Sequence, residues 1–139
     1  MKRLVIDASV ILRAFFPDEE GQKESQVLIE DWIKGRVEIV APSFLFLEVT
    51  NAVLVAVRRG RITGAKAYEI VRTVKGLSIP VVDYDIEEVF EVAAKFDLSA
   101  YDATYVALAD KPYILVTGDK KLYQALKEGE RVKWIGDYV

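Results

Sequence analysis

Four carboxylates stand at positions from which an α/β chain can bring them together. Asp7 ends the apolar run 3–7, Asp119 follows the apolar run 113–117 by two residues, and Asp102 begins a helical segment before that run. Glu48 is the only charged residue in the apolar segment "FLFLEVTNAVLVAV" (44–57). A buried charge without a partner is costly, so such a group normally pairs, binds a metal or takes up a proton.

The absence of two residue types restricts the chemistry available to these acids. The chain has no His and no Cys, which excludes a Ser-His-Asp triad, an imidazole base, a thiolate nucleophile and His- or Cys-ligated metals. Clustered carboxylates repel one another unless a cation lies between them. Mg²⁺ or Mn²⁺ suits a set of oxygen ligands, activates a bound water and polarises a phosphodiester. The sequence therefore predicts a Mg²⁺ or Mn²⁺ site at Asp7, Glu48, Asp102 and Asp119.

Each acid also has a purely structural explanation. Asp7 can end a strand, Asp102 fits an N-terminal capping box, and Asp119 suits the start of a helix. Glu48 can be a buried protonated acid or the partner of an arginine. Asn51, one turn after Glu48, is predicted to hold its carboxylate or a bound water.

Apolar runs alternate with amphipathic segments along the whole chain. Strands are predicted at 3–7, 37–42, 79–84, 113–117 and 131–135, and helices at 8–16, 22–34, 43–59, 63–76, 85–96, 99–109 and 119–127. This alternation is typical of an α/β fold with a mostly parallel sheet. In such sheets, ligands bind outside the carboxyl ends of the strands. We therefore expect the acids to meet at that edge, with Glu48 two turns into the helix after the second strand.

Composition and net charge exclude several classes of protein. The chain has 139 residues, 52% of them hydrophobic, and a net charge of −3, which predicts one globular domain over 1–139 and excludes a broadly basic nucleic-acid binder. The start "MKRLVIDASV" does not fit a signal peptide, and the run 44–57 is too short to span a membrane. A cytoplasmic protein is the expectation.

Four stretches, taken in order, resemble a known family. "VIDASVILRAFF", "LFLEVTNAV", "LSAYDATYVALA" and "LVTGDKKL" resemble PIN-domain ribonucleases, in particular the VapC-type toxins of toxin–antitoxin pairs. The resemblance covers essentially the whole chain. It implies a three-layer α/β/α fold with a five-stranded parallel sheet, and metal-dependent endonucleolytic cleavage of RNA. It also implies a homodimer and a cognate antitoxin that occupies the active site.

The resemblance also assigns roles to residues. Asp7, Glu48 and Asp102 would be the main Mg²⁺ or Mn²⁺ ligands, and Asp119 a fourth carboxylate acting directly or through water. Ser9 and Thr117 match polar positions that support the site, and the candidates for RNA contact are Arg13, Arg58, Arg59, Arg61, Lys120 and Lys121. Many members carry a further acid shortly after the "T-x-D" motif. Here two lysines follow, so a one-metal site fits this chain at least as well as a two-metal site.

Two other functions compete with this interpretation. An acidic-pocket phosphotransfer domain would need further acids beside Asp7, where Ala8 and Ser9 stand instead. A catalytically inactive PIN-like module that binds RNA or protein is the non-enzymatic alternative. The helix over 44–57 is apolar nearly all round, and such a helix is either interior or faces a partner, either a second copy or an antitoxin helix.

Overall fold

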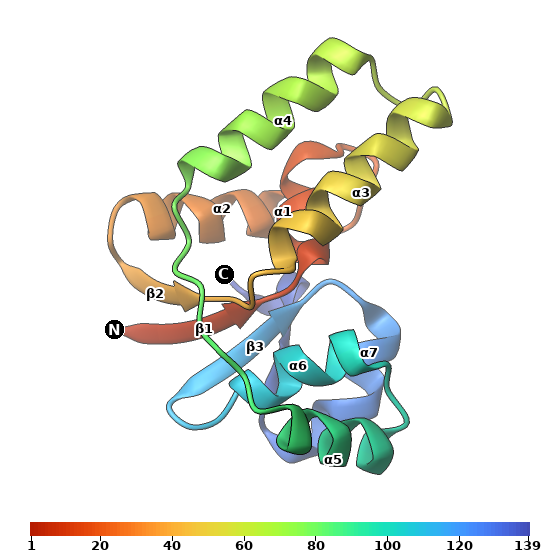
Figure 1. The fold of residues 1–139 in the computed structure, drawn as a ribbon. Coiled ribbons are helices and arrows are strands. Elements are labelled where there is room, and N and C mark those ends of the chain that lie inside the picture. The colour runs from red at the N-terminus through yellow and green to blue at the C-terminus, as the bar shows by residue number, and fades with distance from the viewer.

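The computed structural model describes residues 1–139 and has a parallel sheet at its centre (Figure 1). Its strands are β1 (Lys2–Ile6), β2 (Val37–Val40), β3 (Tyr113–Thr117) and β4 (Val132–Trp134), in the order β2-β1-β3-β4. The last three residues of β1 and of β3 are buried, as expected for central strands covered on both faces. Because all neighbouring strands are parallel, their carboxyl ends share one edge.

Helices cover both faces of the sheet, which confirms the predicted α/β/α layers. They are α1 (Ala8–Phe15), α2 (Gln22–Ile33), α3 (Leu45–Arg58), α4 (Gly64–Gly76), α5 (Ile86–Phe96), α6 (Ala100–Leu108) and α7 (Lys120–Leu126). Figure 1 shows α1 and α2 on one side of the sheet and α5, α6 and α7 on the other, with the α3–α4 hairpin projecting from the body. None of these helices combines the length and the apolarity that crossing a membrane would require.

The sheet has four strands, so the expectation of five is wrong in this detail. The segment predicted as a strand at 79–84 forms only one parallel bridge, between Ala41 and Val81. Two backbone hydrogen bonds hold it, from Ala41 N–H to the Pro80 carbonyl and from Val82 N–H to the Ala41 carbonyl. Proline has no N–H to donate to a ladder, and Ser78, two residues before Pro80, has a positive φ of 52°. These two residues prevent a longer strand.

The long apolar helix α3 begins at Leu45, so Glu48 lies in its first turn and not two turns inside the helix as expected. A stripe that includes Val49 and Val53 is buried against the core. Leu47 and Leu54 on another side are 71% and 41% exposed. The helix is therefore half interior, and its second apolar face has no partner within the chain.

Candidate active site

Asp7 directly follows β1 and lies beside the end of β3, at the carboxyl edge of the two central strands. It is the N-cap of α1, where its carboxylate accepts hydrogen bonds from the Ser9 backbone N–H at 3.1 Å and from the Ser9 hydroxyl. The Thr117 hydroxyl, at the end of β3, donates to its other oxygen. Only 7% of Asp7 is exposed. Burial raises its pKa from 3.8 to about 6, and the charge of Asp119 adds to this, against the lowering effect of the hydroxyl hydrogen bonds.

The loop after β3 is fixed to the same point. Gly118 N–H donates to the Ser9 hydroxyl at 2.8 Å, and Asp119 N–H donates to the Thr117 hydroxyl at 3.0 Å. Asp119 is the N-cap of α7 and accepts from a backbone N–H of that helix at 3.1 Å. Ser9 and Thr117, predicted as supporting residues, therefore connect Asp7 to the Asp119 loop.

Glu48 is half-buried, and it is held by Tyr105, which was not among the predicted site residues. The Tyr105 hydroxyl donates a hydrogen bond to Glu48 Oε1, and the Tyr105 ring, itself buried, packs edge-on against Phe44 at 5.5 Å. Burial raises the Glu48 pKa, the charge of Asp102 raises it further, and the Tyr105 hydrogen bond lowers it. Tyr105 follows Asp102 by three residues on one helix face, and that spacing is the signal by which it could have been found.

Asp102 stands in the first turn of α6, where its backbone N–H donates to the Ser99 hydroxyl at 3.1 Å. The N-cap expected from the sequence is therefore present. Burial raises the pKa of the Asp102 carboxyl, and the charge of Asp119 raises it further. Because Asp119 also raises the pKa of Asp7, and Asp102 that of Glu48, the four acids interact electrostatically as one group.

No cation compensates this group. None of the ion pairs in the structure includes any of the four acids. No three carboxylates converge closely enough to surround a metal ion as they stand. Hydroxyl and N–H donors hold Asp7, and the Tyr105 hydroxyl holds Glu48. The donor set nevertheless fits a hard divalent cation, since it consists of mutually repelling carboxylates only.

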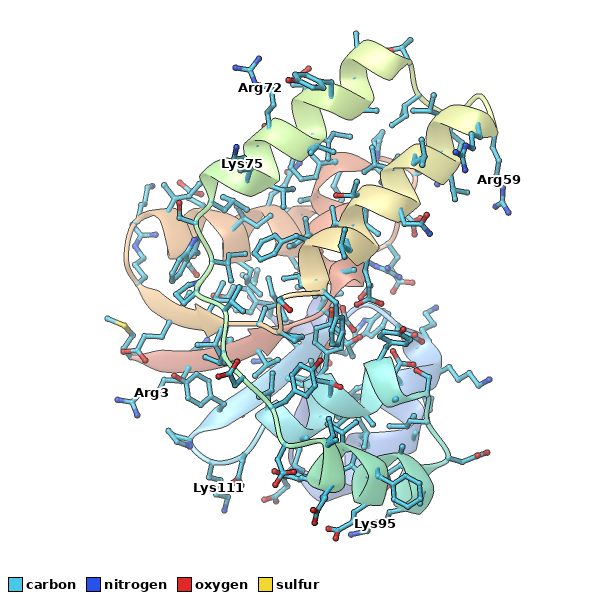
Figure 2. All side chains as sticks on the ribbon, in the orientation of Figure 1. Arg3, Arg59, Arg72, Lys75, Lys95 and Lys111 are labelled. Atoms are coloured by element: carbon cyan, nitrogen blue, oxygen red, sulfur yellow. The ribbon has the colours of Figure 1, made fainter.

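The predicted RNA-contacting cations are dispersed. Arg61 forms two hydrogen bonds to Asp18, at 2.8 and 2.9 Å, and lies over the Phe16 ring. Arg59 is at the free end of the α3–α4 hairpin (Figure 2), and with Arg58 it lies about 16 Å along α3 from Glu48 at 1.5 Å per residue.

The remaining candidates lie nearer the acids. Arg13 lies against the Gly118 backbone, Lys120 follows Asp119 directly, and Lys121 is exposed. Asn51 is exposed on α3, and no hydrogen bond joins it to Glu48.

Comparison with known proteins places this arrangement in a family. The sequence profile of the PIN domain matches residues 4–127. Ribonuclease VapC3 of Pyrobaculum aerophilum is 26% identical over 113 residues, which cover 78% of this chain and 82% of that protein. VapC ribonuclease Mb0985 of Mycobacterium bovis is 32% identical over 123 residues, which cover 86% and 87% of the two chains.

A solved structure agrees with these sequence matches. The crystal structure of PAE2754 from Pyrobaculum aerophilum superposes with a TM-score of 0.72 at 25% identity, covering 96% of this chain and 91% of that one. The fold, the family profile and the named relatives thus agree over nearly the same residues. This chain belongs to the PIN-domain family, and its curated relatives are proteins of the VapC type.

Proposed function

We propose that this protein is a Mg²⁺- or Mn²⁺-dependent endoribonuclease. Asp7, Glu48 and Asp102 are the main metal ligands, and Asp119 is a fourth carboxylate that acts directly or through water. The observation that carries the proposal is the group of four interacting carboxylates without a paired cation at the carboxyl edge of the sheet. The relatives named ribonucleases support the choice of a nuclease.

The side chains around the acids have separate tasks in this mechanism. The hydroxyls of Ser9 and Thr117 fix the orientation of Asp7, and Tyr105 fixes that of Glu48. A bound Mg²⁺ or Mn²⁺ would supply an activated water and neutralise charge on the phosphodiester. Because burial raises the pKa of Asp7 to about 6, this residue must lose its proton before it can serve as a ligand. We therefore expect activity to rise as the pH passes through that range.

The test is cleavage of RNA of mixed sequence in Mg²⁺, in Mn²⁺ and in EDTA. The variants are Asp7→Asn and Glu48→Gln, each of which removes one charge at nearly constant shape. Glu88→Gln is the matched control, because Glu88 is exposed on α5 and forms no ion pair. A circular RNA is included because only an endonuclease can open it.

The expected result is metal-dependent opening of the circular RNA by the wild type and by Glu88→Gln. Asp7→Asn and Glu48→Gln should lose at least about 100-fold in rate, the scale of a missing electrostatic contribution in an active site. RNA binding without cleavage in any metal would instead support the inactive PIN-like module. Cleavage that persists in EDTA would refute the metal-dependent mechanism.

We also propose that the protein is the toxin of a type II toxin–antitoxin pair and forms a homodimer. The VapC names of its relatives support the first statement. Exposed apolar side chains support the second, because α3 leaves Leu47 71% exposed and α5 leaves Ile86 and Phe90 73% and 75% exposed. Inhibition of the RNA cleavage by the protein encoded next to it would identify the antitoxin. Full activity in a saturating excess of that protein would contradict the pairing.

A further inference from the structure

An aromatic residue extends the candidate active site along the sheet edge. Trp134 ends β4 and is paired in register with Thr117, which ends β3 and donates to Asp7. The ring is partly exposed. Ligands of open parallel sheets lie outside the carboxyl ends of the strands. A ligand that extends from Asp7 and Asp119 along this edge of the sheet would therefore reach Trp134 next.

Two cations lie over this ring. The Arg13 guanidinium is 5.6 Å from the centre of the Trp134 ring, and the Lys120 ammonium is 5.9 Å from it. Arg13 is anchored further by its Nε–H, which donates to the Glu20 carbonyl at 2.8 Å. Lys120 pairs with the Glu20 carboxylate at 3.2 Å, but both side chains are mostly exposed, 70% and 65%. That ion pair is weak in water, so an incoming anion can replace the carboxylate.

Two glycines make this arrangement possible. A Cβ on Gly118 would lie 2.7–2.8 Å from Arg13 side-chain atoms, and a Cβ on Gly136 would lie 2.5 Å from the Trp134 indole nitrogen. Neither glycine has a positive φ, so the backbone conformation does not require glycine at either position. The absence of side chains instead allows Arg13 to lie flat against the loop that carries Asp119, and the indole to lie over the turn after β4.

Arg13 and Lys120 lie beside the negatively charged acids, so their position affects how an RNA backbone can approach the site. The four acids have no cationic partner, so an RNA backbone meets repulsion at the carboxyl edge unless cations nearby attract it. Arg13 packs on the residue before Asp119, and Lys120 is the residue after it. The aromatic ring orients both without neutralising them.

We propose that Arg13 and Lys120, held by Trp134, form a binding site for an RNA phosphate adjacent to the one that is cleaved. The site rests on the proposed ribonuclease function, since it places the substrate backbone beside the acids. Its ligand is a phosphodiester anion of the chain. Arg13 supplies the donors of the terminal guanidinium nitrogens, and Lys120 exchanges its contact with Glu20 for the phosphate.

The test measures binding of a short fluorescent single-stranded RNA in EDTA, so that cleavage plays no part. Arg13→Gln is compared with Arg72→Gln, which removes the same charge from a guanidinium that lies 5.7 Å above the Tyr68 ring. Arg72 is on the outer side of α4 and points away from the body (Figure 2). Arg13→Gln should weaken binding roughly tenfold, the effect of one charge-assisted hydrogen bond, and should reduce the slope of log Kd against log salt by about one. Arg72→Gln should change neither value.

A second variant moves Arg13 without removing it. Gly118→Ala places a methyl group against the Arg13 side chain and should weaken RNA binding in the same direction. Equal effects of Arg13→Gln and Arg72→Gln, or no effect of either, would overturn the proposal. The separate cleavage experiment keeps the two proposals apart. Lost binding in Arg13→Gln together with an absence of cleavage in any metal would refute the nuclease and leave Arg13 as an RNA-phosphate contact of a module that does not cleave.

Discussion

The Tyr105 hydroxyl donates a hydrogen bond to Glu48 across a sequence separation of 57 residues. Tyr105 is 1% exposed and stands on α6 three residues after Asp102, whereas Glu48 is in the first turn of α3. This contact joins helices on opposite sides of the sheet, and it fixes the position of one candidate metal ligand. Burial and the Glu48 charge raise the pKa of Tyr105 above its ordinary value, so the phenol stays protonated and remains a donor.

Tyr105→Phe should therefore affect both stability and metal binding. The loss of a half-buried hydrogen bond to a carboxylate should reduce the free energy of unfolding by about 1–2 kcal/mol. Glu48 also loses the hydroxyl that fixes its orientation, so its carboxylate should bind Mn²⁺ about 10–100-fold more weakly, as when the hydrogen-bond partner of a metal ligand is removed. Urea denaturation and Mn²⁺ titration by calorimetry measure the two effects. Tyr68→Phe, on an exposed ring, is the control. An unchanged Mn²⁺ affinity in Tyr105→Phe would show that the contact is only structural.

Asp7→Asn should stabilise the metal-free protein at neutral pH. The pKa of Asp7 is raised from 3.8 to about 6 in the folded state. Between these values the folded protein binds more protons than the unfolded chain, so stability falls as the pH rises through about 6. At neutral pH the ionised carboxylate costs up to about 3 kcal/mol at 1.36 kcal/mol per pKa unit. The amide of the Asp7→Asn variant avoids this cost. The net gain in the free energy of unfolding is smaller by the amount that the altered hydrogen bonds at position 7 cost.

Denaturant titrations of the wild type and of Asp7→Asn across this pH range test that statement. The part of the stability difference that depends on pH should vanish below the unfolded-state pKa of 3.8 and grow until the pH exceeds about 6. A difference that is constant with pH would mean that the Asp7 carboxyl does not change its protonation on folding. Glu88→Gln, on the surface of α5, serves as the reference variant.

Mn²⁺ should raise the melting temperature of the wild type but not that of Asp7→Asn. A ligand that binds only the folded state adds about 2.7 kcal/mol when its free concentration is about 100 times Kd. The increase should be larger above the Asp7 pKa of about 6 than below it, because the cation competes with the proton. Differential scanning calorimetry with Mn²⁺ and with EDTA measures this. Equal stabilisation of both proteins would place the metal elsewhere.

Gly136→Ala should destabilise the fold, because its Cβ would lie 2.5 Å from the Trp134 indole nitrogen. Forcing a ring out of its place costs about 1–3 kcal/mol. Gly129→Ala is the matched control, since no atom lies within 4 Å of its added Cβ and its φ is not positive. Urea denaturation of the two variants makes the comparison. Equal midpoints would mean that the Trp134 ring moves aside at no cost.

The exposed apolar side chains predict a dimer that a single charge can disrupt. Phe90→Asp should shift the mass measured by light scattering from dimer to monomer, because 75% of Phe90 is exposed in the isolated chain and an interface core excludes charge. Tyr113→Phe, which keeps an apolar ring in β3, is a control for general effects of aromatic substitution. A wild type that remains monomeric at every concentration would contradict the dimer.

The order of the elements could be predicted from the sequence because it depends on local patterns. Apolar runs of the right length predict β1, β2, β3 and β4, and the amphipathic segments between them predict each helix to within a few residues. The proximity of Asp7 to the loop that carries Asp119 could also be predicted, because both follow strands of a parallel sheet and the carboxyl ends of such strands lie at one edge. The predicted strand at 79–84 failed because Pro80 and the positive φ of Ser78 affect hydrogen bonding with a neighbour, not the apolar pattern.

The partners of individual side chains were decided by the tertiary structure alone. The sequence shows Glu48 as an acid in an apolar helix, but only the packing of α6 against the sheet brings Tyr105 to its carboxylate. Arg61 looks like a free cation until the loop after α1 places Asp18 beside it. Trp134 joins Arg13 because β4 lies next to β3. Local patterns determine which elements form, whereas these contacts depend on the relative positions of elements far apart along the chain, which only the packed core fixes.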